Sequence, residues 1–118
     1  MPVVKDADKK SLLDIARELV ELAEKARNKK IQPSEMEGHT FSVTNYGSFG
    51  GIYATPIINY PDAAILGIGK MQERFTAKEG KPALQKFLPL SFAFDHRIFD
   101  GAVAAKFLNT LKEKLTSG

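Results

Sequence analysis

The residues best suited to chemistry lie close together near the carboxyl end, from Asp95 to Gly101. His96 is one of two histidines, and an imidazole can accept and return a proton near neutral pH. Asp95, Arg97 and Asp100 place three further charges within six positions, beside apolar residues. Charges in such surroundings are costly unless they are paired or functional. The segment is therefore either a proton-transfer site or a structural knot of ion pairs around a core or surface histidine.

The flanking sequence places this segment at the junction between a strand and a helix. Residues 84–94 predict a long strand, and Pro89 indicates a sheet edge or a bulge there. Residues 101–115 carry apolar side chains at helical spacing. One face of the strand is expected to hold Leu88, Leu90, Phe92 and Phe94. The aromatic residues expected in the core are Phe87, Phe92, Phe94 and Phe99. Because functional side chains are commonly presented at such junctions, His96 is well placed.

Hydrophobic spacing also predicts the elements nearer the amino end. Residues 9–29 form an amphipathic pattern of helical period, which Ser11 or Asp8 could cap. Residues 40–44 alternate apolar and hydroxyl side chains, as in a half-buried strand. Residues 63–69 are a continuous apolar run, typical of a buried strand.

Two glycine-containing segments predict loops. Residues 45–51 hold three glycines, which permit positive φ and the close approach of another backbone. This loop lacks the P-loop lysine and the Gly-x-Gly-x-x-Gly spacing, so nucleoside triphosphate chemistry is not expected. Residues 78–81 predict a turn between a strand at 72–76 and the next strand. The order helix, strand, loop, several strands, helix is that of a two-layer α/β sandwich in one domain.

Composition excludes several classes of function. The 118 residues are 43% hydrophobic and 26% charged, as in an ordinary globular domain. Lys and Arg exceed Asp and Glu by 17 to 14, a dispersed excess that argues against nucleic acid as a partner. The absence of cysteine excludes disulfides, thiolate metal sites and a cysteine nucleophile. His39 lacks neighbours for metal ligation, so we expect a surface residue and no metal.

No apolar run in the chain approaches the length of a membrane span, and no secretory signal precedes the first helix. We therefore expect a protein of the cytoplasm, or of the mitochondrial matrix in a eukaryote, with no membrane partner.

Five fixed positions in the seven residues 95–101 resemble the Asp-His-Arg-x-x-Asp-Gly signature of the acyltransferase core component of 2-oxo acid dehydrogenase complexes, such as pyruvate dehydrogenase. Further blocks of the chain resemble that family at residues 6–11, 22–27, 41–47, 55–59 and 64–68. The resemblance implies a chloramphenicol acetyltransferase-like fold, in which a mixed sheet carries helices on one face. It also implies that residues 1–118 are a carboxy-terminal portion of the catalytic domain.

The resemblance assigns roles to three residues. His96 would be the general base that deprotonates the thiol of dihydrolipoamide or of coenzyme A. Thr44, which by itself is only a β-forming residue in a strand, would supply the hydroxyl that stabilises the tetrahedral oxyanion. Asp100 matches an acid whose structural partner in the family is an arginine from the amino-terminal part of the domain. That arginine is absent here, so Asp100 pairs with Arg97 or Arg74, or is solvated.

The resemblance also implies substrates and partners. Coenzyme A and the lipoyl group are the expected substrates, without a metal. The expected partners are a lipoyl domain, the 2-oxo acid decarboxylase and dihydrolipoamide dehydrogenase. The chain would form a homotrimer or a larger assembly, with the histidine from one subunit and the hydroxyl from its neighbour. The alternative is an inactive module that only self-assembles into a trimer or shell.

Overall fold

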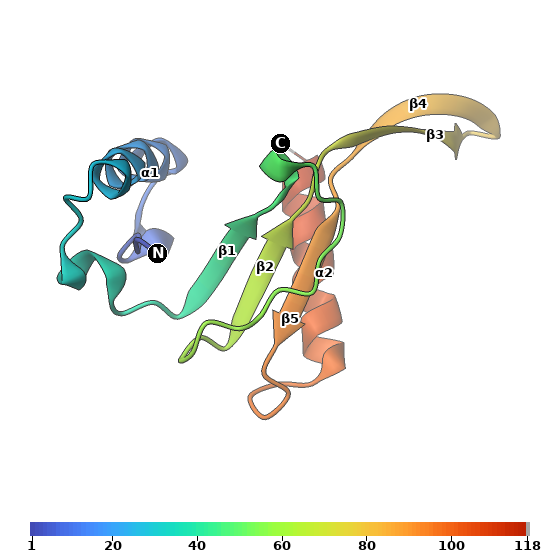
Figure 1. Cartoon of the computed structure of the whole chain (residues 1–118). Coiled ribbons are helices and arrows are strands. Elements are labelled where there is room, and N and C mark those ends of the chain that lie inside the picture. Colours follow the sequence, from blue (N-terminus) through green and yellow to red (C-terminus); the bar gives the residue numbers. More distant parts are fainter. Residues whose placement is uncertain (118) are drawn as a thin grey trace. The chain divides into compact units, whose positions relative to one another are not determined.

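The structure is a computed structural model that describes residues 1–117. The chain divides into two compact units, Met1–His39 and Thr40–Gly118. The first unit is helical, and the second contains all the described strands together with the segment around His96 (Figure 1). Among the described residues, the helices are too short or too polar to cross a membrane.

Helix α1, Leu12–Arg27, organises the first unit. The Ser11 hydroxyl accepts the Asp14 backbone N–H at 3.1 Å, which satisfies one of the donors that a helix start leaves without a partner. The predicted helix at residues 9–29 is confirmed, and Ser11 rather than Asp8 caps it. Asp8 lies instead in a short 3-10 helix, Ala7–Lys9.

The connector after α1 folds back onto that helix. It contains a second 3-10 helix, Pro33–Met36. Within it the Glu35 carboxylate accepts the Gln32 backbone N–H at 2.9 Å and the Lys25 ammonium at 2.7 Å. These two contacts lower the pKa of Glu35, and the same ion pair raises the pKa of Lys25. Leu22 is the buried residue of α1.

A three-stranded mixed sheet forms the centre of the second unit. Its strands are β1, Phe41–Asn45, β2, Ala64–Ile68, and β5, Leu90–Phe94, with β2 in the middle. β1 runs parallel to β2, whereas β5 runs antiparallel to it. Four of the five residues of β2 are buried, which confirms the buried strand predicted at residues 63–69.

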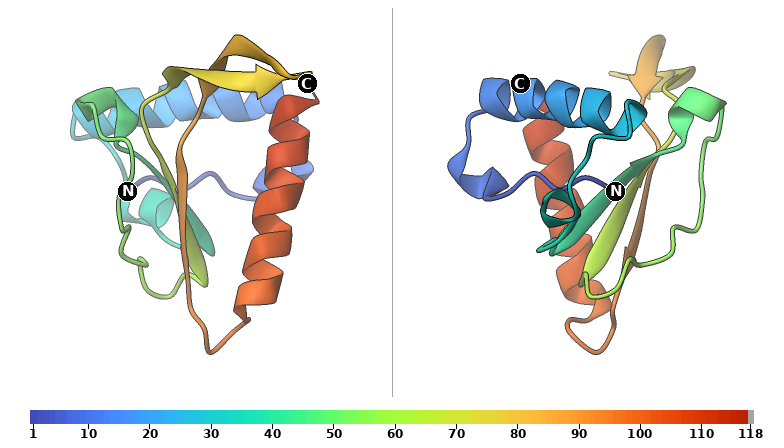
Figure 2. Two further views of the ribbon diagram at one scale, coloured as in Figure 1. Left: turned by 90° about the vertical axis from the view of Figure 1, so that its right-hand side faces the viewer. Right: turned by 60° about the vertical axis from the view of Figure 1, so that its left-hand side comes forward.

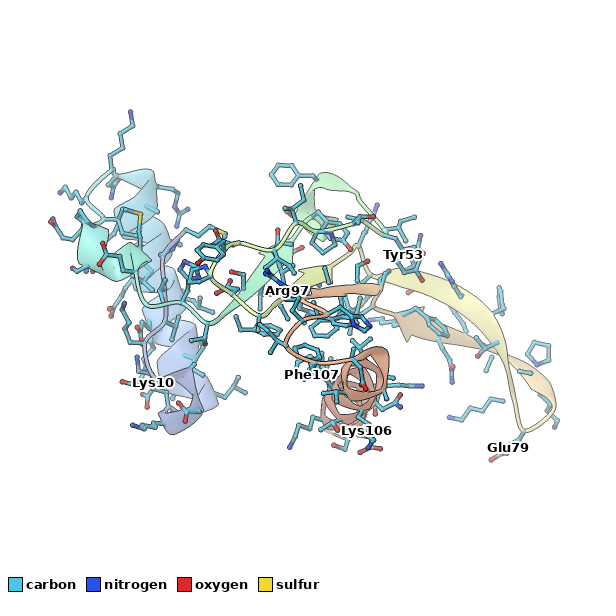
Figure 3. The ribbon with its side chains drawn as sticks, turned by 90° about the horizontal axis from the view of Figure 1, so that it is seen from below. Lys10, Tyr53, Glu79, Arg97, Lys106 and Phe107 are labelled. Atoms are coloured by element: carbon cyan, nitrogen blue, oxygen red, sulfur yellow. The ribbon has the colours of Figure 1, made fainter. Side chains whose placement is uncertain are left out.

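Helix α2, Gly101–Thr116, packs along one face of this sheet beside β5 (Figures 1 and 2). The Phe107 ring of α2 stacks on Phe92 at 4.9 Å between centroids and meets Phe41 at 5.7 Å (Figure 3). Ala104 is the buried residue of the helix. The predicted helix at residues 101–115 and the α/β class are both confirmed.

A two-stranded hairpin extends from the sheet (Figure 1). Its strands are β3, Gln72–Lys78, and β4, Lys81–Phe87. Glu79 and Gly80 form the turn at its tip, with φ of 54° and 77°, as a two-residue type I′ hairpin turn requires (Figure 3). The turn predicted at residues 78–81 is confirmed.

Two sequence-based predictions around Pro89 are wrong. The long strand predicted at residues 84–94 is two strands in different sheets, β4 and β5. Pro89 cannot donate to a strand ladder, and its carbonyl instead accepts the Gly69 N–H at 2.9 Å. Phe87, which we expected in the core, is 37% exposed.

Candidate active site

His96 lies in a turn that leaves β5 and leads to α2. The Asp95 N–H donates to the Ala63 carbonyl at 2.8 Å, which ties the start of the turn to β2. The Ile98 N–H donates back to the Asp95 carbonyl at 2.9 Å and closes the turn. His96 is exposed, and its ring lies against Phe94 at 5.7 Å between centroids. The imidazole is therefore held at the surface, where a substrate can reach it.

Asp95 and Arg97, which flank the histidine, bind each other. The Arg97 guanidinium donates to both carboxylate oxygens of Asp95, with Nε at 3.0 and 3.2 Å and Nη2 at 2.7 Å. The Arg97 backbone N–H also donates to Asp95 Oδ1 at 3.0 Å. These bonds from Arg97 lower the pKa of Asp95 to about 2. Two of the three charges near His96 thus form the ion pair that the sequence left as one of two alternatives.

Asp100 caps α2. Its carboxylate accepts the Val103 backbone N–H at 3.0 Å, at a position where a negative charge also interacts favourably with the helix dipole. Neither arginine suggested as its partner takes that role. Arg97 binds Asp95, and Arg74 donates to Gln72 at 2.7 Å. The carboxylate itself is exposed, so Asp100 secures the helix that follows the turn.

Thr44 lies on β1, on the sheet face opposite to Phe41 and Val43. It is half-buried, whereas Val43 is 55% exposed. In the strand register Thr44 pairs with Gly67, and Gly67 pairs with Ser91, so the three residues form one row across the sheet.

The Tyr46 ring covers the middle of this row. A Cβ on Gly67 would lie 2.7 Å from Tyr46 Cε1, so only glycine leaves room for the ring. The Tyr46 hydroxyl donates to Ser91 Oγ at 3.0 Å. Sequence reasoning missed this cluster, although a glycine inside an apolar strand is a known signal of close approach.

The glycine loop after β1 makes the close backbone contact that the sequence predicts. A Cβ on Gly47 would lie 2.5 Å from the Gly69 carbonyl carbon, and a Cβ on Gly69 would lie 1.9 Å from the Ile52 oxygen. The Tyr46 N–H donates to the Ile68 carbonyl at 3.1 Å, which continues the ladder beyond β1. The end of β1 that carries Thr44 is therefore fixed by the packing of backbone on backbone.

Thr44 and His96 do not meet within one chain. The row that holds Thr44 lies three residues from the row that holds Phe94, about 10 Å along the strands, and His96 lies beyond Phe94. The His96 ring contacts Phe94, whose side chain shares a face with Phe41. Thr44 is on the other face, so a site that uses both residues needs a second subunit.

The last question about the site is whether side chains gather as metal ligands. Among residues 1–117, no three His, Cys, Asp or Glu side chains gather as metal ligands. His39 is half-buried rather than fully at the surface.

The chain matches the model of the family described as 2-oxoacid dehydrogenases acyltransferase (catalytic domain) over residues 1–117. It is 47% identical over 115 residues to the dihydrolipoyllysine-residue acetyltransferase component of the pyruvate dehydrogenase complex of Bacillus subtilis. That match covers 98% of this chain and 26% of the relative. The chain thus spans about a quarter of the length of the curated relatives it matches.

Three solved structures share the fold. A probable dihydrolipoamide acetyltransferase from Listeria monocytogenes has a TM-score of 0.95 at 44% identity, over 98% of this chain and 50% of that one. The Azotobacter vinelandii dihydrolipoamide acetyltransferase, studied for a catalytic serine, histidine and asparagine, has a TM-score of 0.88 at 44% identity, over 93% and 45%. The cubic core of a pyruvate dehydrogenase multienzyme complex has a TM-score of 0.87 at 42% identity, over 92% and 44%.

Proposed function

This chain belongs to the family of 2-oxoacid dehydrogenase acyltransferase catalytic domains, and from that premise we propose that it transfers an acetyl group between coenzyme A and dihydrolipoamide. The observation that carries the proposal is the exposed imidazole of His96, presented by a closed turn between β5 and α2. The acetyl group is preferred over other acyl groups because the relatives are acetyltransferases of pyruvate dehydrogenase complexes.

His96 accepts the proton of the attacking thiol, which is that of dihydrolipoamide or of coenzyme A according to the direction of transfer. The resulting thiolate attacks the carbonyl carbon of the other partner's thioester, and an electron pair moves onto the carbonyl oxygen. When the tetrahedral intermediate collapses, the bond from carbon to the leaving sulfur breaks. The leaving thiolate then takes the proton back from His96, so the protein ends the cycle unchanged.

The Thr44 hydroxyl donates a hydrogen bond to the tetrahedral oxyanion. Such a donor is effective when it is held in place before the reaction, because no reorganisation is then needed as charge develops. The packing of Tyr46 on Gly67 next to Thr44 provides that rigidity. Asp100 contributes by capping α2 immediately after the histidine turn.

Residue spacing in the Azotobacter vinelandii enzyme supports these three assignments. The serine studied there precedes the histidine by 52 positions, and the asparagine follows it by 4. In this chain Thr44 precedes His96 by 52 positions and Asp100 follows it by 4. Serine and threonine both carry a hydroxyl, and asparagine and aspartate are equally good helix caps. Both exchanges therefore conserve the chemistry proposed here.

We further propose a trimer or larger assembly with the site between subunits. The separation of Thr44 from His96 within one chain supports this arrangement, since one subunit would supply the imidazole and its neighbour the hydroxyl. The assembled core would receive acetyl groups from a lipoyl domain. It would work beside the 2-oxo acid decarboxylase and dihydrolipoamide dehydrogenase of the complex.

The decisive assay measures acetyl transfer from acetyl coenzyme A to dihydrolipoamide for the chain and for His96→Ala. We expect a loss of about a hundredfold or more, since a general base contributes that much. His39→Ala is the matched control, because it removes the only other histidine and should leave the rate unchanged.

Two results would contradict the proposal. Turnover that does not depend on His96 would show that His96 is not the general base. Absence of turnover would show that the chain is a module that only self-assembles. The solution mass is an independent test, since a stable monomer with full activity is incompatible with a site shared between subunits.

A further inference from the structure

We propose that Asp95 and Arg97 are positioning residues for His96: their ion pair fixes the turn that presents the imidazole and cancels two charges next to it. The inference rests on the proposed function, in which His96 is the general base. It gives the acid before the histidine a role that differs from a direct hydrogen bond to the imidazole.

The geometry of the pair accounts for the fixed turn. Three guanidinium bonds and one backbone bond join Arg97 to the Asp95 carboxylate across the intervening histidine. The Asp95 backbone N–H is held in turn by the carbonyl of Ala63, the residue before β2. The residue between Asp95 and Arg97 is thus anchored on both sides, while its own side chain stays exposed. A catalytic group misplaced by about 1 Å can lose a hundredfold in rate, so such anchoring matters for a general base.

The side-chain exposures explain why an ion pair is used here. The Arg97 side chain is 85% exposed and that of Asp95 is 20% exposed, so apolar packing does not fix the guanidinium. A bidentate guanidinium–carboxylate pair supplies directional bonds where packing is missing. Asp95, with its pKa at about 2, remains ionised throughout the neutral range, so the pair is intact wherever His96 would work.

The pair also sets the electrostatic potential at the His96 imidazole. Asp95 and Arg97 are its immediate neighbours in sequence, and their opposite charges offset each other. The other charged groups on the adjoining elements are Asp62, just before β2, and Asp100, at the start of α2. Helix α2 itself carries Lys106, Lys112, Glu113 and Lys114. Asp62 accepts a hydrogen bond from Ser42, and Asp100 caps α2. An unpaired Asp95 would favour the protonated imidazole, whereas an unpaired Arg97 would disfavour it.

The test compares Asp95→Asn, Arg97→Gln, Arg97→Lys and the double variant Asp95→Asn/Arg97→Gln in the full chain. Diethyl pyrocarbonate acylates neutral imidazole, and mass spectrometry of the modified peptides gives the pH midpoint of modification at each histidine. His39 lies in the other unit and serves as an internal control in every sample. Arg74→Gln is the matched control for loss of an exposed guanidinium, since Arg74 binds Gln72 in the hairpin.

We expect the midpoint at His96 to rise by roughly half a pH unit in Arg97→Gln and to fall by a similar amount in Asp95→Asn. The double variant should return to the wild-type midpoint. Arg97→Lys keeps the charge but loses the planar fork, so its midpoint should hold while kcat falls about tenfold with KM unchanged. In Arg74→Gln both quantities should stay at their wild-type values.

Equal midpoints in the two single variants would overturn the electrostatic half of the inference, and wild-type kcat in Arg97→Lys would overturn the geometric half. The modification midpoints need no turnover. If the wild-type chain shows no His96-dependent transfer, the proposed function fails by itself. The midpoints still decide whether the pair acts on His96.

Discussion

The two ends of the three-stranded sheet hold their candidate residues by different physical means. At one end, the Thr44 row is fixed by close packing, with the Tyr46 ring against Gly67 and backbone against backbone at Gly69. At the other end, His96 projects from an exposed turn that an ion pair closes. The position of the Thr44 hydroxyl therefore depends on close packing, and the position of the His96 imidazole depends on an ion pair. Substitutions that add volume should damage the first, and substitutions that remove charge should damage the second.

The largest expected effect tests whether the packed end serves the Thr44 hydroxyl. Thr44→Ala should lower kcat for acetyl transfer by about a hundredfold, the usual loss of one oxyanion donor. Thr44→Ser keeps the hydroxyl and should retain most of the rate. Thr55→Ala, at an exposed position outside the sheet, is the control and should behave as wild type. Equal rates for the alanine and serine variants at position 44 would show that the hydroxyl does no chemistry.

Next in size is the effect of adding volume at the packed end. In Gly69→Ala the new Cβ would lie 1.9 Å from the Ile52 carbonyl oxygen, so the backbone must move. We expect a loss of about 1–3 kcal/mol in the free energy of unfolding, the usual cost of overpacking. Gly101→Ala is the matched control, because nothing lies within 4 Å of its Cβ and alanine favours the helix. Urea unfolding of both variants measures the difference, and equal stabilities would mean that the packed end is loose.

A smaller effect is expected at the helix cap beside the charged end. Asp100→Ala should lower the free energy of unfolding by about 1 kcal/mol, because the Val103 N–H loses its acceptor. Asp100→Asn keeps a good cap and should change the stability by only a few tenths of a kcal/mol. Thermal unfolding distinguishes the two variants. If asparagine were as damaging as alanine, the negative charge rather than the cap would be the contribution of this residue.

The smallest effect is the pH dependence of the ion pair. The pKa of Asp95 is lowered from 3.8 to about 2, so the pair adds stability that is complete above the unfolded value and fades as the pH falls towards 2. The difference in urea midpoint between the wild type and Asp95→Asn should thus be constant above about pH 5, fall as the pH passes through 2 and vanish near pH 1. Because the pair is exposed, added salt should also reduce this difference. A difference that persists unchanged at about pH 1 would point to packing by Asp95 instead.

Local sequence signals predict an element best where a residue type favours one particular local structure, such as a turn or a helix cap. The turn at residues 78–81 and a helix cap at Ser11 or Asp8 follow from the sequence, because their geometry is set within a few residues. Pro89 indicates only a sheet edge or a bulge, since the apolar pattern continues through it. Only the assignment of β4 and β5 to different sheets reveals the break, and that depends on distant pairing.

For the candidate site too, the local features follow from the sequence, whereas contacts between distant residues do not. The place of His96 between strand and helix follows from hydrophobic spacing, and the structure confirms it. Ion pairing among the charges around His96 follows from the sequence only as one alternative, and Arg97 is suggested there as a partner of Asp100. The structure pairs Arg97 with Asp95 instead, because spacing alone does not choose a partner. The contact of Tyr46 with Ser91 joins residues 45 positions apart and was missed entirely.

The placement of Thr44 and His96 in different rows and on different faces has a consequence for mixed populations of subunits. If each site takes one residue from each of two neighbouring subunits, two different inactive variants can complement each other. A chain that lacks the hydroxyl and a chain that lacks the imidazole, mixed equally before assembly, would place both intact residues at about one site in four. Activity is then a property of two neighbouring subunits together and not of either polypeptide alone.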